Sequence, residues 1–508
     1  ERNFYISSVI MKNIFYTIDR VIPVNSEVLT RHKTLPQDGY SFFVTDEGDV
    51  IGKFYNERAK NYLEEEIAKE RKSGKIRKVY LKDYPCFPFR AAIEGFYGTP
   101  FTQAQRKDLL SFLKKIRMNA YIYAPKDDLY HRDAWRNDYP GQTLSLLKEL
   151  REEADKNFID FYFAVSPGKD FCYADDKDYL ILLQKLKAVS ACGIDKFALL
   201  MDDIQPVLSE EEAKIYHSPA HAQAALANRL AKDLPKSAPL LFCPTDYMQN
   251  FDTPYREELR KYLQPETEVF WTGYNTVAEA ITEEDGEIVK KCFGREPILW
   301  DNYPVNDFSP KKRIYFGALY NRSRYLYKTH KGYTANLSSL YECNKIPLAT
   351  MADYAWDSEG YDAEESLKKA VAGYFKGCAR AGKTFVRFNE SNIFKKRYPV
   401  KELLEKGNFA ALDSLYAGME NALEVLKQKA PHSFLEETQD LFSAMKYEAD
   451  LYFSLRGKRE IDRKKTAEKL NACRFSAADN SFLKYAAEKA CLDIQTEEER
   501  IIYRSWKI

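Results

Sequence analysis

The sequence predicts an α/β protein: a (β/α)8 TIM barrel with a small α+β domain before it and an all-α bundle after it. Two observations lead to this fold class. Short apolar runs alternate with helical patterns eight times between residues 88 and 360, and the sequence texture changes on either side of that stretch. Eight strand-then-helix units in about 270 residues fit a barrel whose usual size is ~250 residues. A doubly wound open sheet is the alternative, but no G-x-G-x-x-G follows any predicted strand.

The predicted N-terminal domain covers residues 1–87. It combines short β-rich runs with one charged helix that begins near Asn56. The predicted strands are Phe4–Ile10, Ile14–Ile18, Tyr40–Val44, Val50–Phe54 and Ile76–Leu81. The apolar face of the helix carries Ala59, Tyr62, Leu63, Ile67 and Ala68. The Pro-rich segment Pro85–Phe89 is predicted to be a linker.

The predicted catalytic barrel covers residues 88–360. Its eight strands are Ala91–Gly95, Ala120–Tyr123, Phe161–Val165, Phe197–Met201, Pro239–Cys243, Glu268–Trp271, Ile298–Trp300 and Gly332–Thr334. Helical patterns between them include Thr102–Ile116 and Asp175–Val189, and Thr102 is the kind of residue that caps a helix N-terminus. The repeated order of strand then helix indicates a parallel sheet.

Residues 361–508 are predicted to form a helical bundle. Glycine and proline are rare between Lys401 and Ile508, so few positions there interrupt a helix. Apolar residues recur every three or four positions, as in Leu412–Leu426. This spacing is typical of antiparallel helices that pack around a shared core.

Composition argues against several classes of protein. The 77 Lys and Arg residues nearly cancel the 76 Asp and Glu residues, leaving a net charge of +1. A balanced surface without a basic patch does not favour nucleic-acid binding or a polybasic membrane protein. No run of 18 apolar residues exists, so no membrane span is expected.

The cysteines and histidines show no metal-binding pattern. Nine cysteines form no C-x-x-C pair, which favours a reducing compartment such as the cytoplasm. The sequence begins at Glu1, and a trimmed signal peptide would instead place the protein in the periplasm or outside the cell. His217 and His221 have H-x-x-x-H spacing without a Glu between them. We therefore expect no metal and no cofactor.

Polar and aromatic residues follow every predicted barrel strand, at the end where the active sites of such barrels lie. The sharpest feature is the pair Asp202 and Asp203, directly after a buried strand. Neighbouring carboxylates at a partly desolvated strand end repel, so one pKa should rise and the other should stay low. One proton donor and one permanent anion suit glycoside cleavage.

Other interpretations of this acid pair remain open at this point. A helix N-cap or a surface turn also uses aspartates, and so does a Mg²⁺ site, although no further carboxylate has obvious ligand spacing. Successive strand residues point to opposite faces, so both side chains reach one cleft only if the strand ends at Asp202.

Two further strand ends carry residues suited to a sugar. Lys126 lies in a tight P-K-D-D turn and is able to donate to sugar hydroxyls, although a lone lysine there is also typical of a solvated position. Trp300 offers a stacking surface, and Asp301, Asn302 and Asp307 offer hydrogen-bond partners. The alternative for Trp300 is a place in the barrel core.

Six motifs occur in order along the barrel. They are E-G-F-Y-G (Glu94–Gly98), Y-A-P-K-D-D (Tyr123–Asp128), L-M-D-D-I (Leu200–Ile204), F-C-P-T-D-Y (Phe242–Tyr247), W-T-G (Trp271–Gly273) and W-D-N-x-x-x-N-D (Trp300–Asp307). Together they resemble glycoside hydrolase family 84, the retaining β-N-acetylglucosaminidases that include O-GlcNAcases and bacterial hyaluronidase-like enzymes. The resemblance covers about residues 88–345, and the flanking regions resemble the family more loosely.

The resemblance implies substrate-assisted catalysis. The 2-acetamido oxygen of the substrate attacks C1 and gives an oxazoline, so no enzyme nucleophile is required. It implies that Asp202 holds the acetamido N–H and that Asp203 acts as general acid and then as general base. The implied substrate-binding residues are Tyr247 on the acetamido oxygen, Cys243 and Trp300 lining the pocket, and Gly95 (through its carbonyl), Lys126, Asn302, Asp307 and Asn336 on the sugar hydroxyls. Small departures from the family pattern occur at Met201 and Asp246, and neither carries an implied role.

The implied partner is a glycan or glycoprotein that bears terminal β-linked GlcNAc, such as O-GlcNAc on Ser or Thr, and no nucleic acid is expected. One alternative is a chitinase-like or hexosaminidase-like glycosidase, but those families usually carry D-x-E or D-E pairs. The other is a carbohydrate-binding barrel without turnover, against which the intact pair of aspartates argues. The natural aglycone and the oligomeric state do not follow from the sequence.

Overall fold

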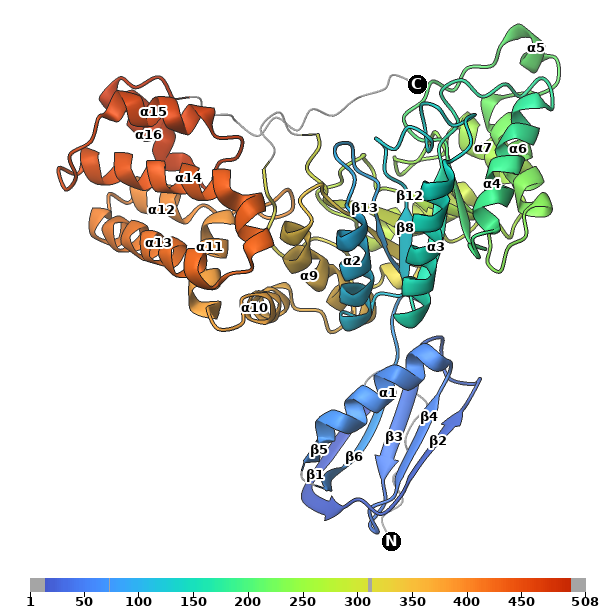
Figure 1. The fold of residues 1–508 in the computed structure, drawn as a ribbon, viewed down its shortest axis with the longest axis horizontal. Helices are drawn as coiled ribbons and strands as arrows, with labels where there is room; N and C mark the ends of the chain where they lie inside the picture. Colours follow the sequence, from blue (N-terminus) through green and yellow to red (C-terminus); the bar gives the residue numbers. More distant parts are fainter. Residues whose placement is uncertain (1–13, 73, 309–312, 495–508) are drawn as a thin grey trace. The chain divides into compact units, whose positions relative to one another are not determined.

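The structure is a computed structural model, and it describes residues 14–72, 74–308 and 313–494 (Figure 1). The chain divides into two units. One consists of Glu1–Pro88 with Ala355–Asp357, and the other of Phe89–Tyr354 with Ser358–Ile508. The predicted strand Phe4–Ile10 lies outside the described residues.

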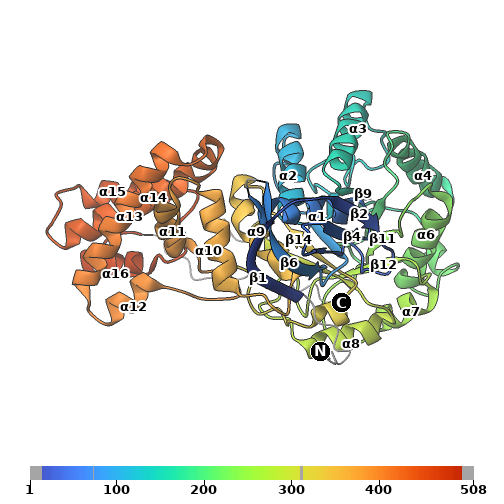
Figure 2. The ribbon, with the colours of Figure 1, turned by 90° about the horizontal axis from the view of Figure 1, so that it is seen from below.

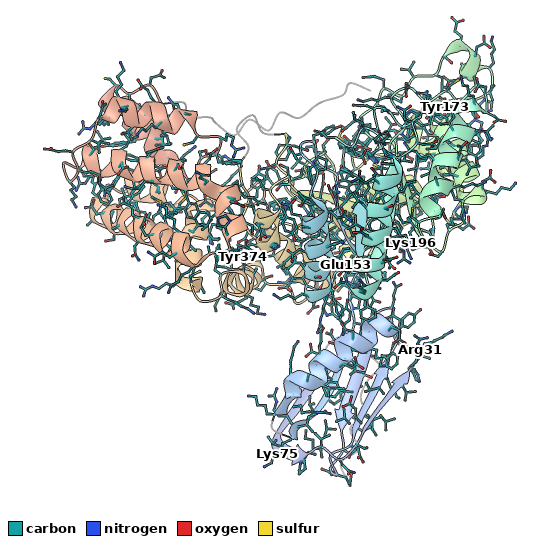
Figure 3. The ribbon with its side chains drawn as sticks, viewed as in Figure 1. Arg31, Lys75, Glu153, Tyr173, Lys196 and Tyr374 are labelled. Carbon is teal, nitrogen blue, oxygen red and sulfur yellow. The ribbon has the colours of Figure 1, made fainter. Side chains whose placement is uncertain are left out.

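The smaller unit is a mixed sheet with one helix. Its elements are β1 (Ile14–Pro23), β2 (Glu27–Arg31), β3 (Tyr40–Val44), β4 (Val50–Phe54), α1 (Glu57–Glu70), β5 (Arg71–Lys72) and β6 (Lys75–Asp83). The strand order is β1-β6-β3-β4-β2, and β5 pairs with β6. Arg31 and Lys75 lie toward opposite ends of this unit (Figure 3).

Local sequence explains these elements. Alternate residues of β3 and β4 are buried, as expected for strands with one face on a core. The Asn56 side chain accepts the N–H of Ala59 and so caps α1, whose buried face carries Ala59, Tyr62, Leu63 and Ile67. Ala68, which the helical pattern placed on that face, is exposed. The segment predicted as a linker is held in place, since the N–H groups of Cys86 and Phe87 donate to the carbonyls of residues 356 and 355.

The larger unit contains a closed barrel of eight parallel strands, which confirms the predicted fold class. The strands are β7 (Phe89–Ile93), β8 (Ala120–Tyr123), β9 (Asp160–Val165), β10 (Phe197–Leu200), β11 (Leu241–Cys243), β12 (Glu268–Trp271), β13 (Ile298–Pro304) and β14 (Gly332–Asn336). They are buried on both faces, which is why the sequence shows them as short apolar runs.

Helices surround the strands (Figure 2). They are α2 (Gln103–Lys115), α3 (Gly141–Lys156), α4 (Lys177–Ser190), α5 (Glu210–Ala213), α6 (Pro219–Asp233), α7 (Pro254–Tyr262), α8 (Glu283–Phe293) and α9 (Lys345–Trp356), with short 3-10 turns at Leu326–Lys328 and Glu342–Asn344. Thr102 caps α2 through a reciprocal capping box with Gln105, as its position predicted. The Ala-rich and Ile-rich interior of the barrel is packed with side chains, so the functional site lies at its mouth.

A helical region follows the barrel in the same unit (Figure 1). It contains α10 (Ala363–Tyr374), α11 (Ala379–Asn389), α12 (Pro399–Glu405), α13 (Phe409–Lys429), α14 (His432–Leu455), α15 (Arg463–Ala472) and α16 (Ser481–Ala490). Its core includes Phe316 and Cys343 from the barrel segment. Glu437 of α14 accepts the N–H groups of Glu342 and Cys343 at 2.8 and 3.2 Å. The Tyr374 hydroxyl donates to Glu342 at 2.8 Å. The helices therefore pack on the barrel through both apolar and polar contacts.

None of the described helices combines the length and the apolar character that a membrane span requires.

Candidate active site

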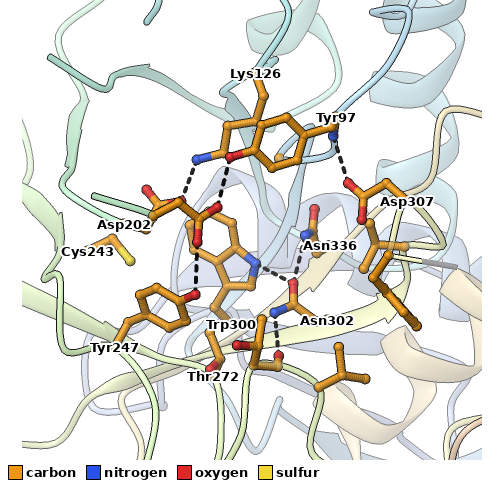
Figure 4. A pocket seen from close by; sticks show the side chains of 16 residues that line it. Tyr97, Lys126, Asp202, Cys243, Tyr247, Thr272, Trp300, Asn302, Asp307 and Asn336 are labelled. Atoms are coloured by element: carbon orange, nitrogen blue, oxygen red, sulfur yellow. Dashed lines mark hydrogen bonds and ion pairs between the residues drawn. The ribbon is translucent and has the colours of Figure 1, made fainter. Parts of the chain in front are cut away.

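A cavity of about 270 Å³ opens at the carboxyl ends of the barrel strands (Figure 4). The residues that line it are Gly95, Tyr97, Lys126, Asp202, Asp203, Cys243, Tyr247, Thr272, Thr276, Val277, Trp300, Asn302, Val305, Asp307, Phe308 and Asn336. All ten site residues that the family resemblance implies are among them. They come from loops after several different strands, so only the closed barrel brings them together.

Asp202 lines the cavity and lies two residues after β10 ends at Leu200. It is only 7% exposed. Its Oδ2 is 2.5 Å from the Nζ of Lys126, whose side chain is 2% exposed. Its Oδ1 is also buried and has no hydrogen-bond partner among the described residues. The carboxylate therefore has one oxygen fixed by a cation and one acceptor left vacant.

The charge of Asp202 is set by its neighbours. Burial alone would raise the pKa of this carboxyl, but Lys126 and Arg132 together hold the pKa below its ordinary value. Two nearby cations therefore favour the anionic form of Asp202.

Asp203 faces the same cavity because its backbone turns. Its φ is +55°, a left-handed conformation that aspartate adopts more readily than most residues. β10 has already ended at Leu200, so the alternation of a strand no longer applies. The hydroxyl of Tyr97 donates to Oδ2 of Asp203 at 2.8 Å, and that of Tyr247 donates to Oδ1 at 3.0 Å (Figure 4).

The two tyrosines differ in exposure. Tyr247 is 6% exposed and Tyr97 is 37% exposed. Burial, with the nearby charge of Asp203, raises the pKa of both phenols, so both hydroxyls keep their protons and act as donors. Tyr97 is therefore the partner of Asp203 that reaches toward solvent.

The opposite wall of the cavity is built on β13 and β14. Asn302 Oδ1 accepts from Trp300 Nε1 at 3.0 Å and from Asn336 Nδ2 at 2.7 Å, and Asn302 Nδ2 donates to the carbonyl of Thr276 at 2.6 Å. Asn336 Oδ1 is buried without a partner among the described residues. A Cβ added at Gly95 would lie 2.8 Å from Trp300 Cζ2, so this wall approaches the backbone closely.

Cys243 and Asp307 complete the set. Cys243 is buried, and burial raises the pKa of its thiol well above the ordinary value, so the sulfur is a neutral, apolar part of the wall. Asp307 accepts the backbone N–H of Tyr97 at 2.7 Å, which ties the loop after β13 to the loop after β7.

The structure corrects one sequence-based assignment. Asp301 lies beside Trp300 in the sequence, but its side chain points away from the cavity and forms a buried ion pair with Arg322 at 2.8 Å and a hydrogen bond with Tyr333 at 2.9 Å. Successive strand residues alternate in direction, so Asp301 and Asn302 cannot both face the site.

Sequence reasoning missed six lining residues: Tyr97, Thr272, Thr276, Val277, Val305 and Phe308. Tyr97 lies within the motif E-G-F-Y-G and Thr272 within W-T-G, so both were visible. Val305 occupies an unspecified position of the motif Trp300–Asp307, and Thr276, Val277 and Phe308 lie outside the quoted motifs. In the part of the chain that the structure describes, no group of three or more His, Cys, Asp and Glu side chains is arranged to hold a metal ion.

Taken together, a closed (β/α)8 barrel with paired acids in a polar and aromatic cavity at its mouth defines a glycoside hydrolase. The chain belongs to the beta-N-acetylglucosaminidase family, glycoside hydrolase family 84, whose sequence model matches residues 90–389.

Known relatives agree with this membership. Protein O-GlcNAcase of Rattus norvegicus and that of Mus musculus are each 37% identical over 268 residues, which is 52% of this chain and 29% of each relative. This match therefore spans less than a third of the length of those relatives.

Solved structures cover more of the chain. CpGH84B superposes with a TM-score of 0.78 at 27% identity, covering 89% of this chain and 86% of that one. A mutant O-GlcNAc hydrolase of Thermobaculum terrenum gives a TM-score of 0.71 at 27% identity, covering 79% and 94%.

Proposed function

We propose that this protein removes terminal β-linked N-acetylglucosamine with retention of configuration, using the 2-acetamido oxygen of the substrate as the nucleophile. One observation carries the proposal. Asp202 is a buried carboxylate with one oxygen bound to Lys126 and the other, Oδ1, without a partner among the described residues. A buried acceptor without a hydrogen bond is unfavourable unless a ligand donates to it, and the amide N–H of the substrate is such a donor.

The charge of Asp202 fits the proposed step. When the acetamido oxygen attacks C1, positive charge develops on the acetamido group and the N–H becomes a stronger donor. An anion fixed in place stabilises this charge without reorganising. Because Lys126 and Arg132 keep the pKa of Asp202 low, the group stays an anion rather than taking the proton. No enzyme carboxylate needs to bond to C1.

Asp203 is proposed as the proton-transferring group. In the first step, protonated Asp203 donates to the glycosidic oxygen as the C1–O bond breaks. In the second step, the carboxylate accepts a proton from the water that attacks C1 of the oxazoline. Its two oxygens face the hydroxyls of Tyr97 and Tyr247, so displacement of the more exposed Tyr97 would free Oδ2 for the leaving group.

The remaining site residues are proposed to bind the sugar. Trp300 and Cys243 offer apolar surface to the ring face and to the acetamido methyl, and Tyr247 offers a hydroxyl to the acetamido oxygen. The hydroxyl groups of the sugar meet polar groups at the cavity wall: the Gly95 carbonyl, Lys126, Asn302, Asp307 and Asn336. The vacant buried Oδ1 of Asn336 is matched by a sugar O–H donor.

We propose a GlcNAc-bearing glycoprotein or glycan as the substrate, with O-GlcNAc on Ser or Thr as the first choice. Relatives that are 37% identical over 268 aligned residues are named Protein O-GlcNAcase, and this name supports the choice of substrate.

The test uses aryl β-glycosides that differ only at C2. We expect hydrolysis of the N-acetyl compound, with the β-anomer released first as followed by NMR. Successive fluorine substitution of the acetyl methyl withdraws electrons from the nucleophilic oxygen, so kcat/KM should fall steadily along that series. The glucoside with a 2-hydroxyl should react more than about a hundredfold more slowly, because it lacks the internal nucleophile. Comparable rates on the acetamido sugar and the glucoside would rule out this mechanism.

A further inference from the structure

Two adjacent aspartates face one cavity only because the second has an unusual backbone conformation. Asp203 has φ of +55°. The left-handed region is unfavourable for a non-glycine residue, so it persists where surrounding contacts hold it. The hydroxyls of Tyr97 and Tyr247 hold the carboxylate of Asp203, but a separate contact holds its backbone.

That contact comes from Arg132. Its Nη2 donates to the carbonyl oxygen of Asp203 at 3.2 Å, and its Nη1 donates to the Oγ of Ser166 at 3.0 Å. The N–H of Ser166 in turn donates to the carbonyl of His131 at 3.0 Å. Arg132 follows β8, Ser166 follows β9 and Asp203 follows β10, so one guanidinium joins the ends of three neighbouring strands.

Arg132 differs from two other buried arginines of this barrel, Arg256 and Arg322. It is 3% exposed, and no carboxylate in the described part of the chain lies within ion-pair distance of it. By contrast, the buried Arg256 pairs with Asp246 at 3.1 Å and the buried Arg322 pairs with Asp301 at 2.8 Å.

A buried cation without an ion partner is expensive unless nearby anions compensate it. Asp202 is such an anion: burial has the largest effect on the pKa of Asp202 and raises it, whereas Lys126 and then Arg132 lower it. The guanidinium is therefore tied to the acid pair in two ways, by a hydrogen bond to the backbone of one acid and by its field on the other.

We propose that Arg132 is a positioning residue that fixes the backbone of Asp203 so that the two acids converge on one cavity. This inference rests on the proposed function, because it assigns Arg132 to the proton-transfer step of that reaction. Arg132 does not line the cavity and makes no contact with the sugar in this scheme.

The test compares Arg132→Gln and Arg132→Lys with Arg295→Lys as the matched control. Arg295 also donates to backbone carbonyls, those of Gln264 and Thr267 at 2.8 Å, but it precedes β13 and so lies at the amino end of the strands, away from the cavity. The substrates are dinitrophenyl and phenyl N-acetyl-β-glucosaminides. The first leaves without a proton, and the second needs one.

If Asp203 is mispositioned, kcat/KM for the phenyl substrate should fall at least about tenfold more than for the dinitrophenyl substrate, since acid catalysis is worth on the order of 10²–10⁴. Arg132→Gln should also move the acidic limb of the pH profile to higher pH, because loss of the guanidinium charge raises the pKa of Asp202. Arg132→Lys keeps the positive charge but loses the two-pronged guanidinium that donates to both Ser166 and Asp203. The acidic limb of the pH profile should therefore stay in place, whereas the larger loss on the phenyl substrate should remain.

Equal losses on both substrates, or losses no larger than those of Arg295→Lys, would overturn the proposal. Each ratio compares two substrates on the same preparation, so a variant that folds only in part still gives an answer. Failure of the wild-type protein to cleave either substrate would instead refute the proposed function.

Discussion

Lys126→Met tests whether a buried ion pair keeps Asp202 an anion. Removing one partner of a buried pair costs about 3–5 kcal/mol, because the remaining charge keeps its desolvation cost. The protein has an alternative, which is to protonate Asp202. From an ordinary pKa of 3.8, protonation at pH 7 costs about 4.4 kcal/mol at about 1.36 kcal/mol per pKa unit. The loss of unfolding free energy is therefore limited to about 4 kcal/mol at pH 7.

The same reasoning gives a pH dependence. At pH 5 the cost of protonating Asp202 falls to about 1.6 kcal/mol, so the variant should lie closer to the wild type there. In the wild type the folded-state pKa of Asp202 lies below 3.8. The stability that Asp202 contributes is thus fully present above pH 3.8 and is lost only as the pH falls through the folded pKa. Between pH 7 and pH 5, Asp202 therefore adds no pH dependence to the stability of the wild type. The difference in unfolding free energy between the two proteins changes over this range because Asp202 is more easily protonated in the variant at pH 5.

Differential scanning calorimetry measures this difference. An unfolding entropy of about 2.1 cal/mol/K per residue over the roughly 420 residues of the larger unit gives about 0.9 kcal/mol/K. The Tm of Lys126→Met should then lie about 5 °C below that of the wild type at pH 7 and about 2 °C below at pH 5. Lys107→Met is the control, because it removes a solvent-exposed pair with Glu149, and pairs of this kind contribute little to stability. A Tm deficit that is the same at both pH values, or no larger than that of the control, would refute the reasoning.

Two further variants test the acid and the shape of the cavity. Asp203→Asn should lower kcat/KM for a phenyl N-acetyl-β-glucosaminide by about 10²–10⁴ and for a dinitrophenyl one far less, and full activity on the phenyl substrate would exclude Asp203 as the acid. Gly95→Ala places a Cβ 2.8 Å from Trp300 Cζ2 and 3.0 Å from Asn336 Oδ1, so it should weaken binding of GlcNAc in calorimetric titrations. An unchanged affinity would show that Trp300 and Asn336 shift to accept the methyl group without loss of binding.

Much of the barrel followed from the sequence. The predicted strands Ala120–Tyr123 and Glu268–Trp271 coincide with β8 and β12, because a strand buried on both faces is a short apolar run bounded by polar residues. β2 (Glu27–Arg31) was missed for the converse reason. It is mostly exposed, so its sequence carries no alternation and its existence depends on pairing with β4.

For the site, too, the sequence identified some features and left others undetermined. The family motifs contain nine of the ten lining residues that the resemblance implied, because each motif lies at or just after the visible end of a strand; the tenth, Asn336, lies outside them. The distinction between Asp301 and Asn302 was not visible, because it depends on the direction of alternation along β13 and on Arg322. Nor did the sequence show that Tyr97 contacts Asp203, which lies 106 positions away along the chain.

The amino-acid sequence by itself determined which side chains stand at the strand ends, because apolar runs and their polar successors are local patterns. Only the tertiary structure decided how those side chains meet. Whether Asp203 joins Asp202 in one cavity depends on a left-handed backbone and on a guanidinium from another strand end. Contacts of that kind join positions far apart in the chain, so they exist only once the barrel has closed.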